Sequence, residues 1–136
     1  MSEMKGVRWG WLKAMYICTI IVAGGFGLGM ILAPSTLQSM FDNVCDPVTY
    51  GINGSVFLAF GLLAILGLRD PLKFAPILLL QLVYKTLWFI GVVLPLLVTG
   101  RFPASEILTV VIFALVIVGD VIAIPFAYVL AKKAAA

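Results

Sequence analysis

Apolar residues fall into four long runs along this chain, and short segments containing proline and charged residues separate them. The runs cover residues 11–33, 48–68, 72–98 and 104–130. Each run reaches the roughly 20 residues that a helix needs to cross a bilayer. None alternates with the period of two that a membrane-spanning strand shows, and lipid offers no water to backbone groups, so we expect helices. The pattern predicts one all-α domain over residues 1–136, an antiparallel four-transmembrane-helix bundle.

Helix start signals lie between the runs. Asp46-Pro47 and Asp70-Pro71 each combine an acidic N-cap with proline at the first helical position, which predicts the starts of the second and third helices. Ser105 and Glu106 are typical of the start of the fourth.

The longest connection, residues 34–46, has a helical pattern of its own. Ser35 and Gln38 have the spacing of a capping box. One helical face repeats apolar residues, namely Leu37, Met40, Phe41 and Val44. We expect a short amphipathic helix on the outer membrane interface between helices one and two.

Composition agrees with this class of protein. With 63% hydrophobic and 11% charged residues, the chain has too little polar surface to coat a soluble globule. If every run crosses the membrane, seven basic residues fall on one side, namely Lys5, Arg8, Lys13, Arg69, Lys73, Lys132 and Lys133. The opposite loops contain only Arg101, so both termini of this multi-pass protein are expected in the cytoplasm, with the spans in the inner or plasma membrane. The net charge of +3 follows from this topology and gives no reason to expect a nucleic-acid partner.

Two ionisable residues interrupt the apolar runs at their centres. Lys85 lies in the third run and Asp120 in the fourth. Counting residues places both about 15 to 18 Å into the membrane at 1.5 Å per residue. A charge at that depth costs roughly 2.5 to 3.5 kcal/mol on insertion scales, so we expect the two to face each other in a buried salt bridge.

Further polar side chains share the face of Lys85. Gln81, Tyr84 and Trp88 lie on the same stripe of the third helix, at the spacing of a helical face. Ammonium, hydroxyl and amide groups beside an aromatic wall are typical of a small-ligand pocket. Asn53, Glu106 and Thr109 are candidates for a shallow outer vestibule above it.

The lack of histidine and the small number of cysteines exclude several chemistries. There is no histidine, which excludes His-ligated haem, His-based metal sites and His general bases. Cys18 and Cys45 are predicted at different depths, so we expect no disulfide, no metal site and no cofactor. Gly25 and Gly29 have the small-xxx-small spacing of close helix contacts, which we interpret as packing of span one on span two in preference to dimerisation.

Three consecutive segments give the chain a family resemblance. They read GGFGLGMILAP, then YGINGSVFLAFGLLAILGLRDPLKFAP, then YKTLW. On these segments the chain resembles the small DoxX-like families of four-helix membrane proteins. The resemblance implies a four-helix membrane fold, and some members of such families are subunits of quinone-reducing complexes.

Several functions fit these features. The first hypothesis is a central pocket around Lys85 and Asp120 that binds a small amphipathic molecule, lipid-like or quinone-like, in a protein that acts as an accessory subunit. Its partners would be membrane lipids, a homo-oligomer or a membrane complex. The alternatives are a proton-coupled transporter in which protonated Asp120 releases Lys85, a membrane isomerase using Asp120 and Tyr84 as acid and base, and a salt bridge that only sets helix register.

Overall fold

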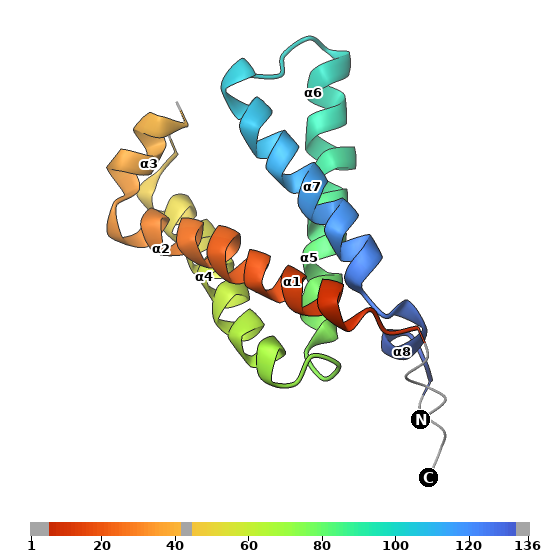
Figure 1. The fold of residues 1–136 in the computed structure, drawn as a ribbon. Helices are drawn as coiled ribbons and strands as arrows, with labels where there is room; N and C mark the ends of the chain where they lie inside the picture. The colour runs from red at the N-terminus through yellow and green to blue at the C-terminus, as the bar shows by residue number, and fades with distance from the viewer. Residues whose placement is uncertain (1–5, 42–44, 133–136) are drawn as a thin grey trace.

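The computed structural model describes residues 6–41 and 45–132, and every regular element in these ranges is helical (Figure 1). The first long helix consists of α1 (Trp9–Thr19), the π-helical turn η2 (Ile20–Gly24) and α2 (Gly25–Leu32). The second is α4 (Pro47–Arg69). The third consists of α5 (Ala75–Trp88), the π-helical turn η3 (Phe89–Val93) and α6 (Leu94–Val98). The fourth begins with the 3-10 turn η4 (Ala104–Glu106) and continues as α7 (Ile107–Ala123). Two short helices remain, α3 (Pro34–Met40) and α8 (Phe126–Val129).

The all-α class and the four long apolar helices predicted from the pattern are confirmed. Four helices are long and apolar enough to cross a membrane, namely Trp9–Leu32, Pro47–Arg69, Ala75–Val98 and Ala104–Ala123. The fourth ends seven residues earlier than the predicted residue 130. Ile124 has an extended backbone there (φ −67°, ψ 124°), because the ring of Pro125 disfavours the helical conformation of the residue before it.

The two Asp-Pro signals have different outcomes. Asp46 is the N-cap of α4, where its Oδ1 accepts a hydrogen bond from the Thr49 N–H at 2.9 Å. Asp70 instead ends α4 as its C-cap, and its Oδ1 accepts from the Lys73 N–H at 3.4 Å within a turn. The prediction that Asp70-Pro71 begins the third helix is therefore wrong, and that helix begins at Ala75.

A short helix is present in the longest connection, but it starts in another way. Ala33 is the N-cap of α3 and Pro34 is its first residue, with no side-chain hydrogen bond at the cap. The predicted capping box of Ser35 and Gln38 is wrong, because proline at N1 already fixes the start of the helix one residue earlier. Val44, expected on the apolar face, lies outside the described residues.

Glycines bring the first two long helices together. A Cβ atom added at Gly27 would lie 2.6 Å from the Gly54 carbonyl oxygen, and one at Gly61 would lie 2.5 Å from the Gly24 Cα. Span one thus packs on span two as expected, at Gly24 and Gly27. A Cβ at Gly25 would meet no atom of the described residues within 4 Å, and one at Gly29 would meet Leu37 of α3, so the contact with span two expected at Gly25 and Gly29 is made by other glycines of the same helix.

The third helix ends in a motif that turns the chain toward the fourth. After α6, Gly100 takes a positive φ of 66°, which only glycine adopts without strain. The Gly100 N–H bonds to the Leu97 carbonyl at 3.1 Å and the Arg101 N–H to the Leu96 carbonyl at 2.9 Å. These are the two hydrogen bonds of a Schellman motif, and they satisfy carbonyls at the end of the helix.

The four long helices form two pairs that are close at one end and diverge at the other. Helices α1 and α2 lie along α4, and α5 lies along α7. The pairs meet where α1 contacts α7, and there the apolar core consists of Leu12, Met15, Tyr16, Ala64, Leu78, Val116, Ala123 and Ile124. Figure 1 shows that α2 and α3 then lead away from α6 and the start of α7. The arrangement is more open than a parallel-sided bundle.

Candidate functional site

Four buried polar side chains lie where the two helix pairs meet. Thr19, Gln81, Lys85 and Asp120 are each at most 3% exposed. They come from α1, α5 and α7. A buried polar group without a partner is costly, so the partners of each atom determine what this cluster can do.

Gln81 is the centre of the cluster. Its Nε2 donates to Asp120 Oδ2 at 3.0 Å and to Thr19 Oγ1 at 3.3 Å. The Thr19 hydroxyl has one proton, and it donates that proton to the Met15 carbonyl at 2.8 Å. Gln81 therefore ties α5 to both α1 and α7.

Lys85 does not form the predicted salt bridge. Over residues 6–41 and 45–132, no Lys or Arg nitrogen lies within 4.0 Å of a carboxylate oxygen, so the expected ion pair between Lys85 and Asp120 is wrong. Gln81, one helical turn before Lys85, binds Asp120 Oδ2 instead. The other oxygen, Asp120 Oδ1, is buried and has no hydrogen-bond partner among the described residues.

The Lys85 ammonium is surrounded by aromatic side chains. Its Nζ donates a hydrogen bond to the Tyr84 hydroxyl and lies 4.3 Å from the centre of the Tyr84 ring. The Phe113 ring centre is 4.6 Å away. Both distances are typical of cation–π contacts, which accommodate the charge without neutralising it.

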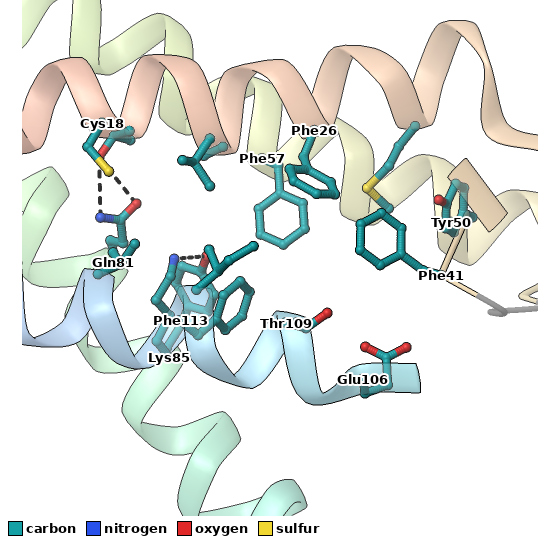
Figure 2. A pocket seen from close by; sticks show the side chains of 17 residues that line it. Cys18, Phe26, Phe41, Tyr50, Phe57, Gln81, Lys85, Glu106, Thr109 and Phe113 are labelled. Atoms are coloured by element: carbon teal, nitrogen blue, oxygen red, sulfur yellow. Dashed lines mark hydrogen bonds between the residues drawn. The ribbon is translucent and has the colours of Figure 1, made fainter. Parts of the chain in front are cut away.

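A cavity of about 150 Å³ begins at this cluster and extends between the helix pairs (Figure 2). Figure 2 shows Cys18, Gln81 and Lys85 at one end and Thr109 and Glu106 at the other. Aromatic rings line the part between them, namely Phe26, Phe57 and Phe113. We call the end at Lys85, deep between the helices, the inner end, and the end at Glu106 the outer end. The inner end is thus cationic, the outer end is acidic, and the part between them is apolar.

The candidates from the sequence are placed unequally around this cavity. Gln81 and Lys85 line its inner end, together with Tyr84, to which Lys85 is hydrogen-bonded, and Glu106 and Thr109 line its outer end. The remaining three candidates do not line it. Asp120 is buried against Gln81, Trp88 packs on Phe113 with ring centres 5.1 Å apart, and Asn53 is exposed on α4.

Sequence reasoning missed the contribution of the first two long helices. Thr19, Cys18 and Phe57 all lie at the cavity or its inner end. Thr19 carried a signal, since it is a hydroxyl side chain inside an apolar run, at a depth that a residue count can compare with Gln81. The position of Phe57 carried none, because aromatic residues are frequent throughout these runs.

The helices define a multi-pass membrane protein. Large apolar side chains are exposed along the outer faces of all four long helices, among them Ile21 at 67% and Val98 at 78%, as a lipid environment allows. Within the described ranges, no three His, Cys, Asp or Glu residues gather as metal ligands would. No protein-family model matches the chain, and no curated protein or solved structure is significantly similar to it. The DoxX-like resemblance stays a prediction.

Proposed function

We propose that this protein crosses the membrane with four antiparallel helices and binds a small amphipathic molecule, lipid-like or quinone-like, between its two helix pairs. In this proposal both termini are cytoplasmic, α3 lies on the outer interface, and the protein acts as an accessory subunit or homo-oligomer. The polar head lies at Lys85 and the apolar body lies against Phe57 and Phe113.

One observation carries the proposal. Lys85 is 3% exposed, faces a cavity, and has no carboxylate within ion-pair distance among residues 6–41 and 45–132. An ammonium has three donor hydrogens, and the Tyr84 oxygen accepts one of them. A ligand with acceptor atoms would bond the others. A residue that only sets helix register would be better served by the salt bridge that Lys85 lacks.

Native mass spectrometry tests the proposal. Protein released gently from membranes is expected to carry a lipid-extractable molecule, and Lys85→Met is expected to lose it while remaining folded and monodisperse. Lys13→Met is the matched control, because Lys13 is exposed on α1 and its substitution removes the same charge. Equal occupancy in wild type and Lys85→Met, at matched folding, would leave the buried cluster with a purely structural role.

A second candidate function, proton-coupled transport, is favoured by Asp120. Its Oδ1 is buried and has no hydrogen-bond partner within residues 6–41 and 45–132, so the carboxyl has an acceptor position where a proton could bind. In this mechanism Asp120 exchanges a proton while Lys85 holds the transported molecule. Proteoliposomes with an imposed pH gradient would show uptake that Asp120→Asn abolishes. Uptake unchanged by Asp120→Asn would exclude this candidate and leave ligand binding untouched.

A further inference from the structure

We infer that the bound molecule is a single-chain carboxylic acid, with its carboxylate at Lys85 and Tyr84 and its chain directed toward Glu106. The inference rests on the proposed function and specifies the chemical class of its ligand. It follows from the donors at the inner end, the volume of the cavity and the charge at each end.

Two unused donor groups stand side by side at the inner end. The Tyr84 hydroxyl accepts a hydrogen bond from Lys85 Nζ, which leaves its own proton free to donate. Lys85 keeps two donor hydrogens beyond that bond. Both side chains line the cavity. A carboxylate offers two acceptor oxygens to these two neighbouring donors, and charge-assisted hydrogen bonds of this kind are about twice as strong as neutral ones.

The protein's own carboxylate at this depth does not compete for the site. Asp120 is 0% exposed and accepts from Gln81 through Oδ2. It does not line the cavity, since Gln81 lies at the inner wall instead. A carboxylate that reaches Lys85 therefore enters from the cavity as part of a ligand.

The volume of the cavity favours one chain. A cavity of about 150 Å³ has room for a group the size of benzene. The carboxylate head and the first methylenes of one chain fill that volume, and the rest of a longer chain extends past Glu106, whereas two acyl chains side by side do not fit. The lining between the two ends is apolar or aromatic and includes Val22, Ala23, Phe26, Phe57, Ile112 and Phe113. Such a wall suits a hydrocarbon chain.

The charge at each end sets the direction of the ligand. Glu106 and Phe113 lie seven residues apart on one face of the fourth helix, which is about 10 Å at helical rise. An anionic head near Glu106 would meet a like charge at the cavity wall, whereas the same head at Lys85 meets the ammonium directly, because the nearby Asp120 lies outside the lining and is bonded to Gln81. The carboxylate is therefore at the inner end and the chain at the outer end.

Binding of three probes with the same chain tests the inference. Dodecanoate, methyl dodecanoate and dodecylamine are titrated against the full chain in nanodiscs of phosphatidylcholine, and bound probe is counted by native mass spectrometry. Dodecanoate is expected to bind at least about tenfold more tightly than either other probe, a difference of about 1.4 kcal/mol. Lys85→Gln is expected to remove that preference, and Lys13→Gln, which removes an exposed charge, is expected to keep it.

A second variant keeps the test decisive if Lys85→Gln fails to fold. Tyr84→Phe removes only the hydroxyl, and it is expected to weaken dodecanoate while leaving methyl dodecanoate unchanged. Dodecanoate binding that is equal in wild type and Tyr84→Phe would overturn the two-donor site.

The remaining outcomes separate the inference from the proposed function. If methyl dodecanoate or dodecylamine binds as tightly as dodecanoate, the carboxylate inference is wrong and the amphipath-binding proposal stands. If phosphatidylglycerol in the nanodisc displaces dodecanoate stoichiometrically, the anion is a phospholipid phosphate and the inference is overturned. If no probe of any charge binds, the carboxylate inference is wrong, and the molecule that co-purifies with wild type and not with Lys85→Met decides the proposed function separately.

Discussion

In the pair formed by α1–α2 and α4, backbone meets backbone where Gly27 faces Gly54 and Gly61 faces Gly24, and neither Gly27 nor Gly61 has room for a methyl group. In the pair formed by α5–α6 and α7, side chains make the contact, through a hydrogen bond between Gln81 and Asp120 and through the rings of Trp88 and Phe113. Side chains can change rotamer or exchange a hydrogen-bond partner, whereas a backbone contact can only be kept or lost. The second pair supplies Gln81, Tyr84 and Lys85 at the polar end of the cavity, and the first pair adds Thr19 there and a wall held by the glycine contact.

The largest expected effect comes from adding one methyl group to the wall held by the glycine contact. In Gly27→Ala the new Cβ meets the Gly54 carbonyl and the Leu58 backbone, neither of which can move aside. Overpacking of this kind costs about 3 kcal/mol at the upper end of its usual range. Thermal unfolding in detergent measures it. Gly25→Ala is the matched control, since its Cβ meets nothing and alanine favours the helix. Equal unfolding temperatures for the two variants would contradict the backbone contact.

The next effect comes from the side-chain pair. Gln81→Leu removes the amide that bonds Asp120 and leaves a buried carboxyl without a donor, at a cost of about 2 kcal/mol. A double-mutant cycle with Asp120→Leu should then show strong coupling between positions 81 and 120. The cycle of Lys85→Met with Asp120→Leu should show less. Stronger coupling for the Lys85 cycle would mean that the ion pair forms after all.

A smaller effect is expected where the first pair is tied to the start of the second. The Tyr16 hydroxyl donates to the Pro71 carbonyl at 2.7 Å, which fixes the turn between α4 and α5 against α1. Tyr16→Phe removes this hydrogen bond and keeps the ring, so stability should fall by about 1 kcal/mol. Hydrogen exchange should rise in the turn and stay unchanged in α7. Faster exchange spread evenly over all helices would assign Tyr16 a general role in packing.

The smallest effect concerns the start of α4 and depends on pH. Hydrogen bonds from the side chain and the backbone N–H of Thr49 hold the pKa of the Asp46 carboxyl below its usual range. A lowered pKa in the folded state stabilises the protein above the carboxyl's unfolded pKa, about 3.9. This contribution is lost as the pH falls through the lower folded value. Asp46→Asn keeps the cap but not the charge, so wild type should be slightly more stable at neutral pH and should lose that advantage in acid. An advantage that persists in acid would exclude the carboxylate as its source.

The sequence predicts what depends on local pattern. Run length and apolar composition locate all four long helices, and Asp46 with Pro47 locates the start of α4. Asp70 with Pro71 is the same dipeptide, yet it closes a helix. The difference lies in what surrounds each signal: the long connection before Asp46 leaves it free to act as a cap, whereas α4 continues up to Asp70 and its carboxylate then stabilises the following turn.

The sequence does not predict which neighbour a buried polar atom binds. Counting residues placed Lys85 and Asp120 at the same depth, and both lie in the buried region where the helix pairs meet. Gln81 and Lys85 share one face of α5 and lie one turn apart, which is about 6 Å along the helix axis. A shift of that size between α5 and α7 decides which of the two meets Asp120, and counting residues does not resolve it.

The π-helical turn η2, between Thr19 and Gly25, sets how the side chains before it are rotated about the helix axis relative to those after it. A π-helical turn holds one residue more than an α-helical turn, and each residue of a helix rotates the face by about 100°. The extra residue is what lets Thr19 point to Gln81 while Gly27 points to Gly54. Deleting a single residue from this turn would shorten the helix very little, but it would rotate one half against the other and break one of these two contacts. The number of residues in this turn therefore determines the angle, about the helix axis, between the side chain that joins the polar cluster and the glycine that contacts α4.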